Sequence, residues 1–235
     1  MQKINLNINE CKIDLDSNMV EIKPRISFYT IYIKRILDIV FSLIALIVFL
    51  PVNFLIGIIT FFDVGRPVFF TQERIGKNLK KFKIIKFRNM KDIRDNNGNL
   101  LPPDQRVTKF GNFVRKTSID ELLNFWNVFK GEMSIIGPRP LICEYLPYYD
   151  SVQIMRHSVT PGLECPSLKK RRQERTWSEQ FEDDIWYVEN VSFKTDCKMV
   201  LALIKLVFHK EEIKQRGKAS RVRFDEECKM KKKEI

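Results

Sequence analysis

The chain has 235 residues, 44% of them hydrophobic, which suits one domain with a real core plus appendages and excludes overall disorder. Its net charge of +12 predicts acidic partners, namely nucleic acid, an anionic membrane surface or phosphorylated substrates. Five cysteines without C-x-x-C spacing and only two histidines indicate neither disulfides nor a zinc site, so a reducing cytoplasm suits the chain and any metal would be a hard cation.

The first 30 residues carry apolar side chains that alternate with polar ones, a period of two that predicts one or two short strands. The acids Glu10, Asp14 and Asp16 and the lack of an apolar stretch exclude a secretory signal peptide. We treat residues 1–30 as an N-terminal extension to which the sequence assigns no role.

Residues 39–62 are almost wholly apolar and exceed the about 20 residues that a helix needs to span a bilayer. Pro51 lies in the middle of this run, and a central proline removes a backbone hydrogen bond and kinks a helix. Basic residues lie on both flanks, so the charge asymmetry of a simple span is absent. A kinked transmembrane helix and a re-entrant hairpin with both ends at the cytoplasmic face both fit, and the second is favoured over the first and over a buried core helix.

A β-hairpin is predicted from residues 68–71 and 82–86, joined by a basic turn around Gly76-Lys77-Asn78. The turn is not a P-loop, because it lacks the upstream glycine and the following Ser or Thr. At the end of the second strand, Lys86 and Arg88 are ordinarily solvated cations, but they would suit a phosphate if the fold turns them inward.

The stretch Ser118-Ile119-Asp120-Glu121 fits a capping box, in which the Glu121 side chain reaches back to the N–H of Ser118. It opens a helix predicted for residues 119–129. This helix is apolar nearly all round, so its polar start, where free N–H groups and the helix dipole favour anions, is its accessible end. The two acids either merely cap the helix or form a site there.

Three later stretches complete the pattern. Gly131 is a plausible end for the helix, and the prolines of Gly137-Pro138-Arg139-Pro140 predict a rigid turn that fixes the direction of Arg139, or else a plain surface turn. Residues 199–208 form an apolar helix that is too short to span a bilayer at ~1.5 Å per residue, so it lies at the interface or in the core. The charged tail from Lys210 is expected to be flexible and able to touch anionic lipid.

Several motifs occur jointly in the order and spacing of one family. They are Lys34-Arg35-x-x-Asp38, the Pro-broken apolar segment, Lys86-Phe87-Arg88-x-Met90, Arg115-x-x-Ser118-x-Asp120-Glu121-Leu122, Gly137-Pro138-Arg139-Pro140, Arg156-His157 with Pro161-Gly162, and Asp184-x-Trp186-Tyr187-x-x-Asn190-x-Ser192. Over residues 30–210 the chain resembles the bacterial sugar transferases, that is, the small monotopic polyprenyl-phosphate phosphoglycosyl transferases.

The resemblance implies an α+β, mostly helical fold. Residues 31–63 would form a re-entrant membrane helix kinked at Pro51, and residues 64–209 a cytoplasmic transferase domain with a β-hairpin and interfacial amphipathic helices, followed by the charged tail 210–235. The implied partners are a UDP-sugar, undecaprenyl phosphate and membrane lipids, at the cytoplasmic face of the bacterial inner membrane. No nucleic-acid partner is expected, and a homodimer is left open.

The implied activity is transfer of a sugar 1-phosphate from a UDP-sugar to undecaprenyl phosphate, with Mg²⁺, as the first membrane step of surface polysaccharide or glycoconjugate synthesis. Asp120 would be the nucleophile that forms a covalent phosphosugar intermediate and releases UMP, and Glu121 would act as a general base; both would hold the Mg²⁺. Phosphate binding would fall on basic side chains that suit phosphate oxygens, namely Lys86, Arg88, Arg115, Arg139 and Arg172.

The chain departs from the family after Pro161-Gly162. Residues 163–171 lack both glycines and the aromatic residue of the usual loop, although the aligned arginine remains as Arg172. Because glycine permits positive φ and close approach to a ligand, the loop should differ in shape. A different sugar, a loop that orders on binding, or a lost activity stay open. The alternative function is therefore a non-catalytic membrane-bound family member that acts as a binding or scaffold subunit, with a nucleic-acid-binding protein a distant third.

Overall fold

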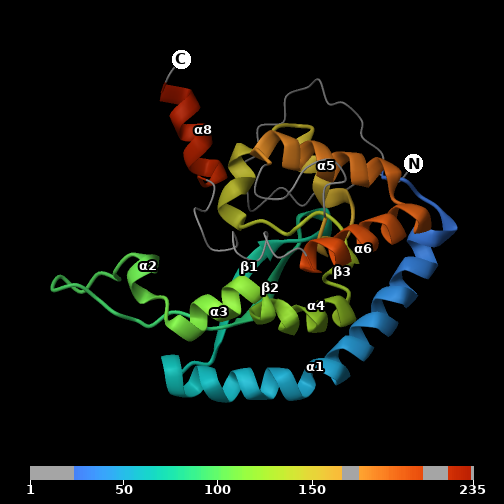
Figure 1. Cartoon of the computed structure of the whole chain (residues 1–235). Helices are drawn as coiled ribbons and strands as arrows, with labels where there is room; N and C mark the ends of the chain where they lie inside the picture. The colour runs from blue at the N-terminus through green and yellow to red at the C-terminus, as the bar shows by residue number, and fades with distance from the viewer. Residues whose placement is uncertain (1–23, 166–174, 209–221, 234–235) are drawn as a thin grey trace.

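The computed structural model of the chain describes residues 24–165, 175–208 and 222–233 (Figure 1). The helices are α1 (Lys34–Val64), α2 (Pro103–Arg106), α3 (Lys109–Thr117), α4 (Phe125–Lys130), α5 (Trp177–Asn190), α6 (Phe193–Phe208) and α8 (Phe224–Lys233). The strands are β1 (Phe69–Ile75), β2 (Lys81–Phe87), β3 (Ser134–Ile136) and β4 (Gly162–Glu164). Shorter helical turns are η2 (Tyr29–Ile33), η3 (Lys77–Leu79), η4 (Ile119–Asn124), η5 (Cys143–Tyr148) and η6 (Gln153–Ser158). The predicted N-terminal strands lie in residues outside this description.

The apolar segment forms one helix, α1, which bends along its length in Figure 1. Pro51 lies inside it and has no N–H to donate, and we attribute the bend to this residue. With η2, the helix spans 36 residues and is the only one in the described part of the chain that is long and apolar enough to cross a membrane. Many of its apolar side chains are exposed, and the rest of the chain covers one face, which carries Asp38, Ser42, Ile56 and Thr60.

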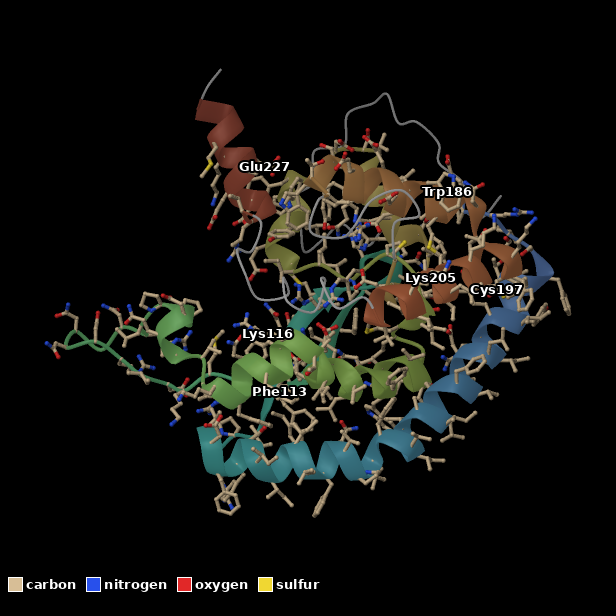
Figure 2. All side chains as sticks on the ribbon, in the orientation of Figure 1. Phe113, Lys116, Trp186, Cys197, Lys205 and Glu227 are labelled. Atoms are coloured by element: carbon tan, nitrogen blue, oxygen red, sulfur yellow. The ribbon has the colours of Figure 1, made fainter. Side chains whose placement is uncertain are left out.

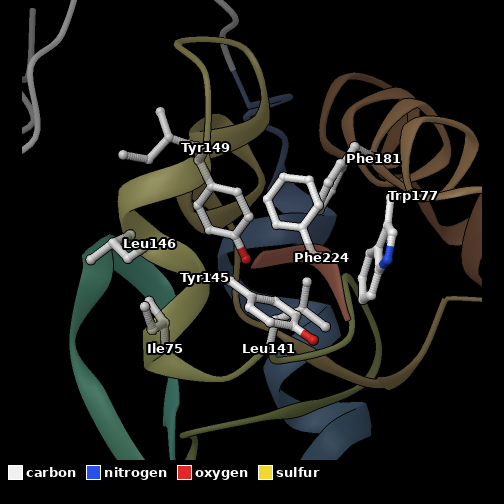
Figure 3. Packing of buried hydrophobic residues seen from close by; sticks show 9 residues of the cluster. Ile75, Leu141, Tyr145, Leu146, Tyr149, Trp177, Phe181 and Phe224 are labelled. Carbon is white, nitrogen blue, oxygen red and sulfur yellow. The ribbon is translucent and has the colours of Figure 1, made fainter. Parts of the chain in front are cut away.

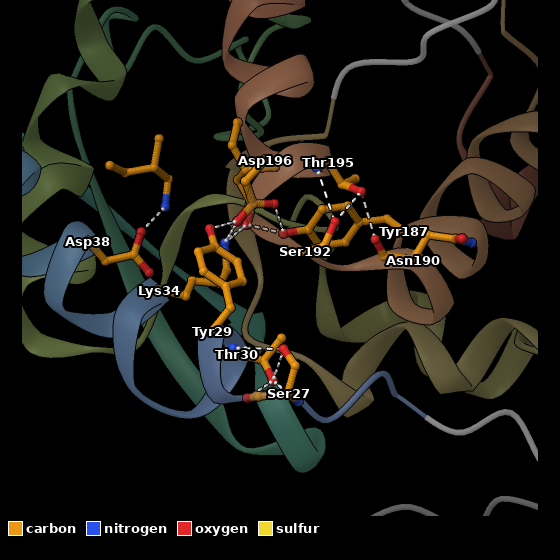
Figure 4. A network of polar contacts seen from close by, with 12 residues as sticks. Ser27, Tyr29, Thr30, Lys34, Asp38, Tyr187, Asn190, Ser192, Thr195 and Asp196 are labelled. Atoms are coloured by element: carbon orange, nitrogen blue, oxygen red, sulfur yellow. Dashed lines mark hydrogen bonds and ion pairs between the residues drawn. The ribbon is translucent and has the colours of Figure 1, made fainter.

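The start of α1 is fastened to α6 by a largely buried polar network (Figure 4). Lys34 Nζ lies 2.6 Å from Asp196 Oδ2 and donates to Ile136 O at 3.0 Å. The hydroxyls of Tyr29 and Tyr187 donate to the same carboxylate at 2.6 and 2.7 Å. Because one carboxylate accepts from an ammonium group and two phenols, it joins the start of α1 to α5 and α6, which lie far away from it in the sequence.

The next residues of the entry motif attach α1 to the centre of the domain. Arg35 donates to Val128 O and Phe129 O, both at 2.7 Å, near the end of α4, where unpaired carbonyls favour a cation. Asp38 accepts the N–H of Ile135 at 3.0 Å. The Lys34-Arg35-x-x-Asp38 motif is therefore a structural attachment for the apolar helix.

The far end of α1 is tied to the same domain. Thr108 Oγ1 donates to Asp63 Oδ2 at 2.5 Å, and Arg88 Nη2 donates to Val64 O at 3.2 Å. Both ends of the bent helix are thus attached to one globular unit.

The predicted hairpin is confirmed and is longer than expected. Strands β1 and β2 pair antiparallel from Phe69 opposite Phe87 to Ile75 opposite Lys81. Strand β2 is held against η4 and α4 by two asparagines: Asn124 Oδ1 accepts from Ile85 N at 3.2 Å, and Asn127 Nδ2 donates to Lys83 O at 2.8 Å. A small apolar core supports this contact, formed by Phe82, Ile84, Val128 and Met133.

The predicted capping box at Ser118 is wrong. Ser118 has a left-handed backbone (φ 57°), makes no side-chain cap bond and ends α3, with its N–H donating to Arg115 O. An N-cap needs an extended backbone, whereas here α3 runs directly into η4. The Glu121 side chain therefore does not reach back to Ser118 and instead contacts Lys86 and Arg139.

The helical run predicted for residues 119–129 is present, but its first half is the 3₁₀ turn η4 and only its second half is the α-helix α4. It ends at Gly131 as predicted. Gly131 has φ 89°, and a Cβ there would lie 3.1 Å from the Arg35 guanidinium, so both conformation and space favour glycine.

The turn that carries Arg139 is placed by a close approach of two glycines. Strands β3 and β4 pair in parallel with Ser134 opposite Gly162. A Cβ at Gly162 would lie 2.1 Å from Gly137 N, and Gly162 N donates to Pro138 O at 3.0 Å. The Gly137-Pro138-Arg139-Pro140 turn is therefore buried against β4 rather than free at the surface.

An aromatic cluster forms a core between η5, α5 and α8 (Figure 3). Phe224 of α8 has its ring centroid 5.0–5.8 Å from those of four partners, Tyr145, Tyr149, Trp177 and Phe181. The indole Trp177 Nε1 also donates to Val222 O at 2.9 Å. Residues 222–233 were expected to be part of a flexible tail, but the buried Phe224 makes the start of α8 part of the core.

Candidate active site

Asp120 and Glu121 lie in η4, directly against β2. Asp120 is only 6% exposed. Burial raises the pKa of the Asp120 carboxyl, and the neighbouring Lys86 charge opposes that rise. The ionised carboxylate is consequently available only above this raised value, next to a fixed positive charge.

Glu121 brings together two cations from separate segments. Lys86 Nζ donates to Glu121 Oε1 at 2.8 Å, and Arg139 Nη2 contacts the same oxygen. Arg139 Nη1 also lies 3.2 Å from Glu164 Oε2. Burial lowers the pKa of Arg139, but the two carboxylates outweigh it and raise the pKa overall. An ammonium group and a planar guanidinium are thus held beside Asp120, a combination that suits phosphate oxygens.

Arg156 fixes the backbone of Arg139, donating from Nη2 to Arg139 O at 2.7 Å. The same nitrogen lies 2.7 Å from Asp184 Oδ2, and the two side chains of this ion pair are 1% and 2% exposed. Burial raises the pKa of Asp184 to about 6, although Arg156 opposes the rise, so the pair is charged at pH 7. Burial lowers the pKa of the adjacent His157 to about 3, which leaves that imidazole neutral. The sequence motifs contained these residues, but their spacing did not reveal that they support Arg139.

The structure places the other predicted phosphate-binding residues differently. Arg88 donates to backbone carbonyls, including Val64 O and Met90 O, and lies 3.5 Å from Asp92, so it braces the end of α1. Arg115 is exposed on α3. Arg172 lies outside the described residues, as does most of the altered loop. Of the five predicted cations, the structure brings Lys86 and Arg139 to Glu121.

The donor set can be compared with what Mg²⁺ requires. Asp120 and Glu121 are adjacent carboxylates, and the described residues contain no group of three or more His, Cys, Asp or Glu that could hold a metal ion. Mg²⁺ usually binds through one or two carboxylates and completes its shell with water and substrate phosphates. The residues present therefore fit Mg²⁺ that binds together with a phosphate.

Comparison with known proteins places the chain among transferases. The sequence model described as bacterial sugar transferase matches residues 29–210, so α8 lies beyond the matched segment. The uncharacterized sugar transferase EpsL of Bacillus subtilis is 45% identical over 161 residues, which cover 68% of this chain and 80% of EpsL. The exopolysaccharide production protein ExoY of Rhizobium meliloti is 32% identical over 191 residues, 74% of this chain and 84% of ExoY.

A third relative, from Aeromonas hydrophila, is named UDP-N-acetylgalactosamine-undecaprenyl-phosphate N-acetylgalactosaminephosphotransferase. It is 33% identical over 184 residues, which cover 75% of this chain but 44% of that longer protein. The family match spans most of the chain and includes Asp120, Glu121 and both cations that meet at Glu121. The chain therefore belongs to the bacterial sugar transferase family of enzymes.

Proposed function

We propose that the protein transfers a sugar 1-phosphate from a UDP-sugar to undecaprenyl phosphate, releasing UMP, as the first membrane step of surface polysaccharide or glycoconjugate synthesis. The observation that carries this proposal is the convergence of Lys86 and Arg139 on Glu121, next to the buried Asp120. The Aeromonas relative is named for this type of transfer, and an Erwinia amylovora relative is named UDP-galactose-lipid carrier transferase.

The transfer takes place in two steps, and Asp120 is the nucleophile of the first. A carboxylate oxygen attacks the β-phosphorus of the UDP-sugar, the bond from that phosphorus to the oxygen bridging to the α-phosphate breaks, and UMP leaves. A phosphate oxygen of undecaprenyl phosphate then attacks the same phosphorus, which frees Asp120 and leaves the sugar on a lipid diphosphate. A covalent intermediate divides one difficult displacement into two easier ones.

The residues around Asp120 offset charge on the reacting phosphate. Lys86 and Arg139 present N–H donors that the carboxylate of Glu121 keeps oriented, and donors fixed in advance need no reorganisation during the reaction. Asp120 and Glu121 would hold Mg²⁺, which would neutralise further charge on the phosphate oxygens. An ionised Glu121 is also able to accept a proton as a general base.

The apolar surface indicates how the protein would meet a membrane. Exposed apolar side chains cover α1, and Phe113 of α3 and Trp126 of α4 are 54% and 46% exposed. Figure 2 shows Phe113 on the side of α3 toward α1 and Lys116 on the opposite side. We infer that α1 enters the bilayer and returns, because both its ends are attached to one domain, while α3 and α4 lie at the interface of the inner membrane.

This topology is testable by labelling single cysteines in a background freed of native cysteines. Ile26→Cys before α1 and Asn97→Cys after it, both at exposed positions, should react from the cytoplasmic side alone. Phe54→Cys, at an exposed position within α1, should be shielded by lipid from either side and serves as the control. Labelling of the first two positions from opposite sides would establish a spanning helix instead.

The activity itself is tested by product identity. Detergent-solubilised protein with Mg²⁺ and undecaprenyl phosphate should release UMP from one member of a panel of UDP-sugars, with net product formation dependent on the lipid. Release of UDP would indicate direct glycosyl transfer without the phosphate and would contradict the proposal. If no donor reacts, the chain would be assigned to the non-catalytic binding or scaffold function.

A further inference from the structure

Besides Lys86 and Arg139, a third cation, Arg74, lies near the candidate site. It is on the same face of the β1–β2 hairpin as Lys86. Side chains alternate along a strand, and directly opposed residues of an antiparallel pair share a face. Lys86 pairs with Phe70, so its face continues along β1 through Gln72 to Arg74. Since Lys86 reaches Glu121, this face of the hairpin is turned toward the candidate site.

The guanidinium of Arg74 has no carboxylate partner among the described residues. Its Nη2 donates to the neutral amide oxygen Gln72 Oε1 at 2.7 Å, and its buried Nε has no hydrogen-bond partner there. Arg139, by comparison, is paired with both Glu121 and Glu164. Charged arginine side chains that are withdrawn from water usually have an anionic partner, because unpaired charge is costly to bury.

The surroundings of Arg74 make its position more unusual. Burial lowers the pKa of Arg74, and the nearby charge of Arg139 lowers it further, while the more distant carboxylates of Glu121 and Glu144 oppose both effects without forming an ion pair with it. Arginine nevertheless stays protonated in proteins, so two like charges are held near each other at the edge of the site. A phosphate with two or more negative oxygens would relieve this repulsion by bridging the two guanidinium groups.

The backbone of Arg74 is fixed in the same region as Arg139. Arg74 forms an isolated antiparallel bridge with Ile142, and the next residue, Ile75, donates its N–H to Leu141 O at 3.3 Å. The two guanidinium groups thus come from segments that are joined by backbone hydrogen bonds a few residues away. Such a support holds a binding group in place before the ligand arrives.

We propose that Arg74, oriented by Gln72, binds a phosphate group of a substrate beside Asp120, in a subsite shared with Arg139. This inference rests on the proposed function for the identity of the substrates. The phosphate belongs either to the nucleotide part of the donor or to the lipid acceptor, and both present the same chemistry to a guanidinium.

Two binding measurements on purified protein separate these sources. The first measures the Kd of UMP by displacement of a fluorescent nucleotide, and the second measures the Kd of a short-chain polyprenyl phosphate in detergent. Arg74→Gln should weaken one of the two by about tenfold or more, as expected for loss of a charge-assisted hydrogen bond. Arg74→Lys should restore part of the affinity, because it keeps the charge but not the planar fork.

The matched control is Lys83→Gln, which removes a cation from the exposed, opposite face of the same hairpin. It should leave both Kd values unchanged, and melting temperatures should show that all three variants are folded. An Arg74→Gln protein that is folded and binds both phosphates as tightly as the wild type would overturn the proposal. Because neither measurement needs turnover, failure of the wild type to release UMP would refute the proposed function without deciding the role of Arg74.

Discussion

Replacing Asp120 by asparagine is expected to lower UMP release by at least about 10³-fold, the scale of loss when a covalent nucleophile is removed. Asparagine has nearly the same shape but an uncharged amide that does not form the acyl phosphate. The buried site should tolerate the change, because burial raises the pKa of the Asp120 carboxyl and the amide removes a charge that is costly to bury. The measurement is UMP formation from the reactive donor, compared with the wild type.

A second assay detects the covalent phosphosugar intermediate on Asp120 directly. Incubation with a sugar-labelled donor in the absence of lipid should leave label on the wild-type protein, released by hydroxylamine as expected for an acyl phosphate. Asp120→Asn should carry none. Asp104→Asn, which changes an exposed aspartate on α2, should behave as the wild type in both assays. Full turnover by Asp120→Asn would mean that another group attacks the phosphorus.

Local sequence patterns predict those secondary-structure elements whose formation depends on interactions between residues close in the sequence. The hairpin around Gly76, the apolar run broken by Pro51, and the helix end at Gly131 all follow from periodicity, proline chemistry or a positive φ. The turn at residues 137–140 was predicted as well, but its burial depends on the contact of Gly137 with Gly162, which no short-range pattern reveals. Elements were therefore more predictable than the contacts between them.

The candidate site shows the same limit. The resemblance to a family indicates Lys86 and Arg139, yet the pattern Ser118-x-x-Glu121 predicts a local capping box. In the fold, Ser118 is the left-handed residue that caps the end of α3, and Glu121 contacts two cations from distant segments. No sequence motif marks Arg74. What distinguishes this residue is that its guanidinium has no carboxylate partner among the described residues, and only the fold shows this.

The start of α8 is the clearest case of long-range packing that composition concealed. The last 26 residues are rich in charge, and the family match ends at residue 210, so nothing local marks Phe224 as a core residue. It is nevertheless 6% exposed and surrounded by four aromatic rings, which come from η5, from the residue that follows η5, and from α5. Its segment thus completes the core of the domain that carries Arg156 and Asp184, the residues that position Arg139.

Phe224→Ala should therefore destabilise the domain by about 3–5 kcal/mol, the usual cost of removing a buried phenylalanine and leaving a cavity. In a chain of this size the melting temperature should fall on the order of 10 °C, measured by thermal unfolding in detergent. Trp177, whose ring centroid lies 5.5 Å from that of Phe224, provides a fluorescence signal for the same transition.

The matched control for this loss is Met230→Ala in the same helix, because Met230 is 56% exposed and its truncation leaves no cavity. It should change the melting temperature by no more than about 1–2 °C, since exposed substitutions usually stay within 0.5 kcal/mol. Equal behaviour of the two variants would mean that α8 does not dock on the aromatic cluster in solution. A large loss confined to Phe224→Ala, with activity recovered at lower temperature, would show that this segment supports the fold rather than the chemistry.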